Sequence, residues 1–159
     1  MSKKMQVSTP TDTTILITRD FDAPRHLVYR TFTEPELLRR WWHANRAEVT
    51  AVEMDVRVGG RYRYAARGAG FEMEFTGEYR EVVPDERLVS TEVFSGAPDY
   101  PALNTTTFTE KDGRTYLELL IEHTSKTSRD MQLASGMEDG LADALVLLEG
   151  VARELAHLT

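Results

Sequence analysis

Four histidines are the first side chains in this sequence to consider for metal binding or proton transfer: His26, His43, His123 and His157. No two of them stand in an H-x-H or H-x-x-x-H spacing, so the sequence predicts no metal site. His123 ends an alternating apolar run that begins at Leu117, which predicts that its side chain points inward. A neutral imidazole there could hydrogen-bond a ligand or act as a general base. The alternative is a structural histidine whose hydrogen bonds are satisfied within the protein.

Glu92 is the second candidate for proton transfer, and whether it faces inward depends on one turn of the chain. With a three-residue loop at 84–86, the following strand turns its odd-numbered residues inward: Val89, Thr91 and Val93. With a four-residue loop, the inward residues are instead Leu88, Ser90, Glu92 and Phe94. A bulge at Gly77 would change the register again. Both registers stay open, and only the second makes Glu92 a buried carboxylate with a raised pKa.

No motif for nucleophilic or nucleotide chemistry stands out in the rest of the chain. The sequence contains no Ser/His/Asp order, G-x-S-x-G elbow, P-loop or G-x-G-x-x-G. Gly59-Gly60 is predicted to form a hairpin turn and not a phosphate cradle. The absence of cysteine excludes thiolate chemistry and a disulfide framework, and it fits a reducing cytoplasm. We therefore expect no cofactor.

The charge distribution disfavours nucleic acid as a partner. The net charge is −7 at pH 7, whereas binding to phosphates needs a basic surface. One basic stripe is present, made of Arg57, Arg61, Arg63 and Arg67. The next predicted strand supplies glutamates that can compensate it: Glu72, Glu74 and Glu78.

No apolar run approaches the roughly 18 residues of a membrane span, and Met1 to Thr14 lack the apolar core of a signal peptide. We expect a cytoplasmic protein with neither a nucleic-acid nor a membrane partner.

The element that must position these side chains is a long amphipathic helix predicted from about Ser128 to Leu158. Apolar residues recur along it with the 3.6-residue period of one helix face: Leu133, Met137, Leu141, Ala144, Leu145, Leu148, Val151, Ala152 and Leu155. At 1.5 Å per residue it would be roughly 45 Å long and would need a broad, concave partner. Gly136 and Gly140 each cost about 0.8 to 1 kcal/mol in a helix interior relative to Ala, which indicates close approach or open space there.

The middle of the chain supplies that partner as a sheet. Period-2 alternation between turn residues predicts strands at about 48–54, 60–67, 71–83, 87–95, 104–111 and 114–124. They follow a strand over Thr13 to Asp22 and two short helices, one beginning at Pro24 and one running from Pro35 to Trp42. The sequence thus predicts an α+β fold, in which a curved antiparallel sheet of about seven strands wraps around the long C-terminal helix. Residues 13–159 form one domain, and residues 1–12 are expected to be a mobile tail with nothing to bury.

Two turns predict the register of the sheet. A two-residue loop at Gly68-Ala69 gives the pairs Arg67–Gly70, Tyr64–Met73, Arg63–Glu74 and Tyr62–Phe75. A two-residue loop at Asp112-Gly113 gives the pairs Phe108–Leu117, Thr106–Leu119 and Asn104–Ile121. Both place large apolar side chains together on one face, which we take as the inner face. The stiff loop from Ser95 to Pro101 suits a rim or lid over one end of the sheet.

Four stretches of the sequence resemble, in the same order, the Hsp90-ATPase-activator homologue family. They are FDAPRHLVYRTFTEPELLRRWW, DVRVGGRYRY, GEYREVVPDERLVST and SGMEDG, and the resemblance covers roughly residues 13 to 157. The family belongs to the START and Bet v 1-like (SRPBCC) superfamily of helix-grip proteins. The resemblance implies that the long helix and the sheet do not close completely and leave an apolar cavity between them. It does not identify a ligand, because members of the superfamily bind lipids, polyketides, hormones or proteins on one scaffold.

The resemblance also implies a ligand site made of the side chains that face this cavity. Together with the predicted registers it gives the residues Trp41, Trp42, Tyr62, Tyr64, Phe71, Met73, Phe75, Phe108, His123, Met137 and Leu141. Adjacent helical residues point about 100° apart, so one of the two tryptophans is expected in the core and the other at the cavity mouth or surface. The alternative is that these apolar side chains simply fill a solid core.

Three functions are compatible with this arrangement. The expected one is binding of a small hydrophobic or amphipathic molecule, without a cofactor. The second is an enzyme that resembles polyketide cyclases or aromatases, with the proton-transfer groups His123, Tyr62 or Tyr64, and Glu92. The third is a chaperone-interacting module of a stress response, as the family name suggests. A single domain lacks the further contacts of a larger co-chaperone, so we expect no strong stimulation of Hsp90 and disfavour a chaperone partner. A homodimer stays open.

Overall fold

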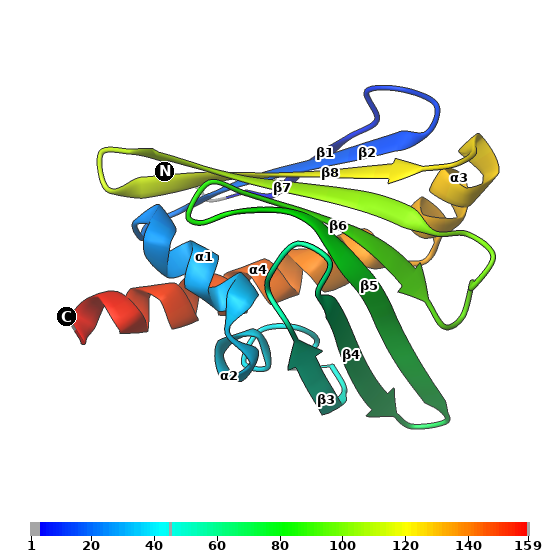
Figure 1. Ribbon diagram of the computed structural model, residues 1–159, viewed down its shortest axis with the longest axis horizontal. Helices are drawn as coiled ribbons and strands as arrows, with labels where there is room; N and C mark the ends of the chain where they lie inside the picture. Colours follow the sequence, from blue (N-terminus) through cyan, green and yellow to red (C-terminus); the bar gives the residue numbers. More distant parts are fainter. Residues whose placement is uncertain (1–3, 45, 159) are drawn as a thin grey trace.

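An eight-stranded antiparallel sheet curves around the C-terminal helix in the computed structural model, which describes residues 4–44 and 46–158 (Figure 1). Its strands are β1 (Gln6–Ser8), β2 (Thr14–Phe21), β3 (Glu48–Met54), β4 (Arg61–Gly68), β5 (Phe71–Val83), β6 (Arg87–Phe94), β7 (Ala102–Lys111) and β8 (Arg114–His123). The helices are α1 (Arg25–Thr33), α2 (Pro35–Leu38), α3 (Lys126–Ala134) and α4 (Met137–His157). The strand order is β1-β2-β8-β7-β6-β5-β4-β3. This confirms the α+β helix-grip prediction, with β1 as an additional strand.

The N-terminal segment departs from the prediction. β1 pairs with β2, so that Val7 lies opposite Ile17, and Val7 packs against the apolar cluster beneath. The expectation that residues 1–12 have nothing to bury is therefore wrong for the described part. A strand of three residues is too short to produce an alternation that the sequence alone could reveal.

The predicted long helix is two helices. α3 ends at Ala134, and α4 begins after Gly136, whose φ of +84° is the left-handed conformation that glycine adopts without strain. The apolar face of α4 is as predicted, since Leu145, Leu148 and Ala152 are all buried. The second short helix also differs, because α2 ends at Leu38 and the two tryptophans lie in the turns that follow.

One of the two predicted registers is confirmed. In the β7–β8 hairpin Phe108 lies opposite Leu117, and Asp112 and Gly113 both have the positive φ of a two-residue turn, +54° and +76°. In the β4–β5 hairpin the register is wrong by two residues. The loop is Ala69-Gly70, with Gly70 at φ +80°, so Tyr64 lies opposite Phe75. A shift of two residues keeps every side chain on its predicted face.

A bulge decides the register left open at 84–86. The loop has three residues, because Val83 pairs with Arg87, yet the even-numbered residues of β6 face inward. The ladder skips one residue of β5, Arg80, between Tyr79 and Glu81. That extra residue reverses the alternation relative to the first half of β5. Glu92 therefore faces the interior, and the bulge is at Arg80 and not at Gly77.

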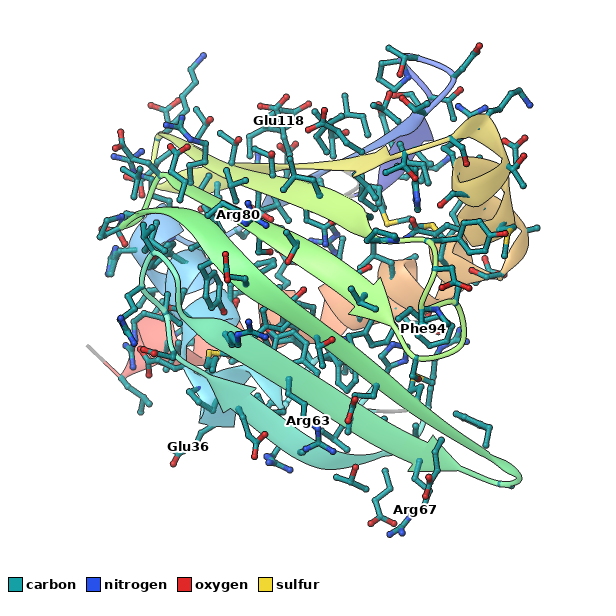
Figure 2. The ribbon with its side chains drawn as sticks, turned by 45° about the vertical axis from the view of Figure 1, so that its right-hand side comes forward. Glu36, Arg63, Arg67, Arg80, Phe94 and Glu118 are labelled. Atoms are coloured by element: carbon teal, nitrogen blue, oxygen red, sulfur yellow. The ribbon has the colours of Figure 1, made fainter. Side chains whose placement is uncertain are left out.

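The outer face of the sheet carries the arginine stripe, and three of its four arginines, Arg57, Arg63 and Arg67, form ion pairs. Arg63 binds Glu74 with an Nε–Oε2 distance of 2.5 Å, and Arg67 binds Glu48 at 2.8 Å. Figure 2 shows Arg63 and Arg67 along the strands on the solvent side. These pairs are exposed, so each contributes little to stability, and they leave no concentrated positive charge on this face.

Two apolar clusters hold the layers together. The larger lies where α1 and α2 pack on α4 and on the sheet, and it includes Phe21, Val28, Leu38, Trp41, Phe108, Leu145 and Leu148. The smaller contains Ile15, Ile17, Ala102 and Ile121, with Leu133 and Met137 packed against it. Between them the concave face of β4 to β7 stands away from the helix.

Candidate functional site

A cavity of about 740 Å³ lies between the concave face of the sheet, α3 and α4. Its floor is formed by inward side chains of β4 to β8, and its roof by α4 from Met137 to Leu145. Close-packed interiors contain few voids larger than a water molecule, so a space of this size is a feature of the fold and not a packing defect. It falls within the range of roughly 300 to 1,000 Å³ that is typical of small-molecule sites.

Ten of the eleven side chains predicted to form the site line this cavity: Trp41, Trp42, Tyr62, Tyr64, Phe71, Met73, Phe75, His123, Met137 and Leu141. Phe108 does not. It is 1% exposed and its ring packs edge-on against Tyr29 and Phe32, at centroid distances of 5.4 Å each. The inner face of β7 was predicted correctly, but α1 covers that end of the sheet, so Phe108 belongs to solid core.

The helix side of the cavity is open at one position. Gly140 lines the cavity, and a Cβ added to it would meet no atom within 4 Å. Ala144 follows one turn later on the same stripe of α4 and is buried. Of the two alternatives predicted for Gly140, close approach or open space, the structure shows open space.

The two tryptophans divide as predicted. Trp41 is buried, and its indole N–H donates to the Thr31 carbonyl at 2.8 Å, which anchors the ring in the core. Trp42 is half-buried and packs edge-on against Phe75, with ring centroids 5.7 Å apart. One indole therefore supports the wall, while the other offers an aromatic surface to the cavity.

Exposed apolar side chains surround one end of the cavity. Phe71, Phe94, Tyr100 and Met131 line it, and each is between 38% and 45% exposed. Figure 2 shows Phe94 at the end of β6, beside the loop that leads into β7. Residues of this loop line the cavity, which confirms the prediction that 95–101 forms a rim. A cluster of large apolar side chains in contact with water is typical of an opening through which an apolar molecule passes.

His43 also lines the cavity, and the sequence analysis missed it. Its backbone φ is +50°, and its ring stacks on Phe75 with a centroid distance of 6.4 Å. Burial and the nearby charge of Arg46 lower the pKa of His43, so the neutral imidazole is favoured. No spacing in the sequence marks this residue, because its place depends on the turn between α2 and β3.

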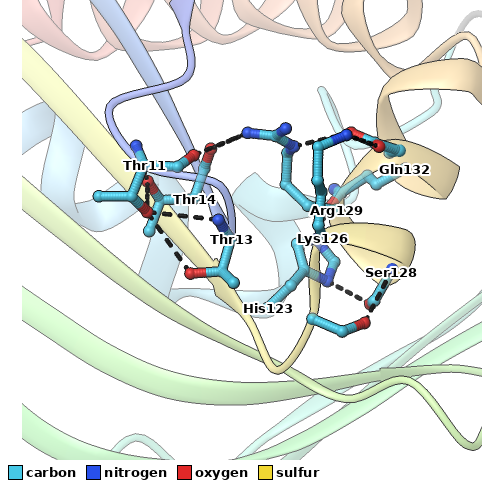
Figure 3. A network of polar contacts seen from close by, with 10 residues as sticks. Thr11, Thr13, Thr14, His123, Lys126, Ser128, Arg129 and Gln132 are labelled. Atoms are coloured by element: carbon cyan, nitrogen blue, oxygen red, sulfur yellow. Dashed lines mark hydrogen bonds and ion pairs between the residues drawn. The ribbon is translucent and has the colours of Figure 1, made fainter.

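His123 takes the structural role that the sequence analysis left as an alternative. Figure 3 shows its ring bound to α3 on both sides: Nδ1 is 2.7 Å from the Ser128 hydroxyl, and Nε2 is 2.5 Å from Oε1 of Gln132. An amide oxygen can only accept, so Nε2 donates to Gln132, and in the neutral ring Nδ1 then accepts from the Ser128 hydroxyl. In the same network the Arg129 guanidinium donates to the Thr11 carbonyl at 2.7 Å. Both ring nitrogens thus fasten α3 to the sheet.

Glu92 is the acidic side chain of the cavity wall. One of its carboxylate oxygens accepts a hydrogen bond from Nδ2 of Asn104 on β7, at 3.1 Å. Burial raises the pKa of Glu92, and the hydrogen bond from Asn104 offsets part of that rise. It lines the cavity and is half-buried, so the accessible part of its side chain faces the cavity.

Three tyrosines complete the polar part of the wall. The Tyr62 ring lies over Gly77, and its hydroxyl donates to the Thr91 carbonyl at 2.6 Å. Burial raises the pKa values of Tyr62, Tyr64 and Tyr79, and the negative charge of Glu92 raises those of Tyr62 and Tyr64 further. All of them stay protonated at neutral pH, so these rings present uncharged faces to the cavity.

The chemistry available in the described residues is limited. Residues 4–44 and 46–158 contain no group of three or more His, Cys, Asp or Glu side chains arranged to hold a metal ion. Over the same ranges, no helix has the length and hydrophobicity that crossing a membrane requires. The arrangement can enclose an apolar molecule, and Glu92 can hydrogen-bond it or exchange a proton with it.

Comparison with known proteins gives one family and several structural neighbours. The model of the family described as "Activator of Hsp90 ATPase homolog 1-like protein" matches residues 22–152. No curated protein matches the chain. A crystal structure of a protein from Rhodobacter sphaeroides is 24% identical with a TM-score of 0.86, covering 98% of this chain and 100% of that one. A Mycobacterium smegmatis protein is 25% identical with a TM-score of 0.84, covering 93% and 96%. CalU16 from Micromonospora echinospora is 23% identical with a TM-score of 0.63, covering 96% and 91%.

Proposed function

Because this chain belongs to the Activator of Hsp90 ATPase homolog 1-like family and has its helix-grip fold, we propose that it binds a small hydrophobic or amphipathic molecule between the sheet and α4. The observation that carries this proposal is the cavity of about 740 Å³. Its wall is mainly aromatic and aliphatic, with few polar groups to orient a ligand. Burial of apolar surface in such a site is the main source of affinity.

The exposed apolar rim supports the same proposal. Phe71, Phe94 and Tyr100 keep large apolar surfaces in water at the open end of the cavity. Such exposure is unfavourable for a cavity that serves only as packing, but it suits the passage of an apolar ligand. The stacked pair Phe75 and Phe94, 4.9 Å apart, extends this surface inward from the rim.

Native mass spectrometry and a dye titration test the proposal together. We expect a small hydrophobic molecule to co-purify, and the neutral dye N-phenyl-1-naphthylamine to fluoresce when added to the emptied protein. Gly140→Leu, which fills the cavity, should abolish both signals. Gly150→Leu makes the same change at an exposed position of α4 and should leave them intact. A broad ligand panel that produces neither an adduct nor a thermal shift would contradict ligand binding.

General acid–base catalysis in the same cavity is the second candidate. Glu92 favours it, because burial raises the pKa of its carboxyl group, and such a group can exchange a proton with a bound substrate. His123 fits this role less well, since both of its ring nitrogens bind α3. Turnover of an aromatic polyketide that is lost in Glu92→Gln would support the enzyme. Binding of the polyketide without turnover would support ligand binding and contradict the enzyme.

Stimulation of a chaperone ATPase, the activity in the family's name, is not what we propose for this chain. The proposed site is the cavity between the sheet and α4, whereas binding a chaperone needs an exposed surface of the order of 1,600 Å² in total. We expect Hsp90 to keep its basal ATPase rate when this protein is added at micromolar concentration. A several-fold rise in that rate would favour the chaperone function instead.

A further inference from the structure

We propose that Glu92 and Asn104 form a polar subsite for the inner end of the ligand, and that this end carries a hydrogen-bond donor, either a hydroxyl or an amine. The subsite selects against ligands that end in a carboxylate or another anion. This inference rests on the proposed function, because it assigns a chemical class to the molecule that occupies the same cavity.

The two side chains meet on the inner face of neighbouring strands. Asn104 lies directly opposite Ser90, and Glu92 is the next inward residue of β6, diagonal to Asn104. Their side chains are joined by the 3.1 Å hydrogen bond from Asn104 to Glu92, and both line the cavity. A ligand that lies against β6 and β7 therefore contacts both groups at once.

Glu92 and Asn104 together present more acceptors than donors. The side-chain N–H of Asn104 donates to Glu92. The side-chain oxygen of Asn104 is buried and has no hydrogen-bond partner among the described residues. Among residues 4–44 and 46–158, Glu92 forms no ion pair, and its hydrogen bond with Asn104 is its only one. The nearby Tyr62 hydroxyl supplies no donor either, because it is bound to the Thr91 carbonyl. Unpaired acceptors away from bulk water are costly, so a ligand that brings an O–H or N–H is stabilised here.

The charges around the cavity argue against an anionic head group. Arg46 lines the cavity but is committed to Asp143, with Nε 3.1 Å from the carboxylate. His43, the other basic side chain near the opening, is kept neutral by burial. An anion beside Glu92 would face a like charge or would require Glu92 to take up a proton, and Arg46 is the one lysine or arginine among the described residues that line the cavity. A hydroxyl or an amine avoids this repulsion.

Three molecules of equal ring size separate the head groups: naphthalene, 2-naphthol and 2-naphthoate. Their dissociation constants are measured at pH 7 by quenching of tryptophan fluorescence. For the wild type we expect 2-naphthol to bind about tenfold more tightly than naphthalene, the effect of one good hydrogen bond, and 2-naphthoate to bind more weakly than either.

The variants then test the residues. Glu92→Leu and Asn104→Leu should each erase the preference for 2-naphthol over naphthalene, and Glu92→Leu should also relieve the rejection of 2-naphthoate. Thr105→Val alters the neighbouring outward-facing residue of β7 and should keep the wild-type order. Melting temperatures show that each variant is folded.

The possible failures are distinguishable. If naphthalene binds but the wild type shows no preference for 2-naphthol over 2-naphthoate, the polar subsite is refuted and the hydrophobic site stands. The same conclusion follows if the preference survives both leucine variants. If the folded wild type binds none of the three molecules, both the proposed function and the subsite are refuted.

Discussion

Filling the cavity from the helix side is the sharpest test of the interior. Gly140 lies on the same stripe of α4 as Ala144 and Leu148, which are 7% and 0% exposed, so a side chain there points at the sheet. A Cβ at Gly140 would meet no atom within 4 Å. Gly150, on the exposed side of the same helix, has equally open space and provides a matched control.

The expected magnitude follows from two contributions. Replacing glycine within a helix gains about 0.8 to 1 kcal/mol from propensity, and this applies to both Gly140→Leu and Gly150→Leu. Only Gly140→Leu also covers apolar surface in the cavity. The stabilisation from this burial is at most that of a fully buried leucine, roughly 1.5 to 3 kcal/mol. Each kcal/mol raises the melting temperature of a domain of this size by about 2 to 4 °C. Both variants should therefore melt higher than the wild type, and Gly140→Leu should melt highest.

Thermal melts with and without N-phenyl-1-naphthylamine complete the test. At a hundred times its Kd, the dye should stabilise the wild type and Gly150→Leu by about 2.7 kcal/mol and leave Gly140→Leu unchanged. Destabilisation of Gly140→Leu by about 1 to 3 kcal/mol would instead be the result of overpacking a solid interior. That outcome would refute the reasoning, and so would an undiminished dye response in Gly140→Leu.

Three further predictions concern the sheet and the helix. Leu148→Ala should cost about 2 to 5 kcal/mol in urea denaturation, because Leu148 is fully buried, whereas the exposed Val146→Ala should stay within about 0.5 kcal/mol; equal losses would show that α4 is not docked as described. Gly77→Ala should lower the melting temperature, because its Cβ would lie 1.9 Å from the Thr91 carbonyl oxygen, and an unchanged melting temperature would contradict that close approach. Burial raises the pKa of Glu92 above its ordinary 4.5, so its contribution to stability is present below pH 4.5 and is lost as the pH rises through the folded-state pKa. Glu92→Gln should thus gain stability relative to the wild type as the pH rises above 4.5, and a difference that is constant with pH would exclude a raised pKa.

Much of the site was predictable because it depends on local patterns that the sheet preserves. The alternation along β4 and β5 placed Tyr64, Met73 and Phe75 inside, and an error of two residues in their pairing did not move them to the other face. His43 and Phe108 show the limit. One lines the cavity because of a turn with positive φ, and the other leaves it because α1 covers that end of the sheet. Neither the turn at His43 nor the packing of α1 over Phe108 can be predicted from residues a few positions away in the sequence.

The sequence by itself determined the features that depend on neighbouring residues: the bounds of most strands, the two-residue turn at Asp112-Gly113, and the apolar stripe of α4. Hydrophobic period and turn chemistry act within a few residues, so they are legible in the chain. Only the tertiary structure decided that the bulge falls at Arg80, and hence that Glu92 faces the cavity. It also decided that the C-terminal helix breaks at Gly136. A bulge bends its strand and increases the local twist against the paired strand, and a break lets two helices meet different parts of the sheet, so both depend on partners that are distant in sequence.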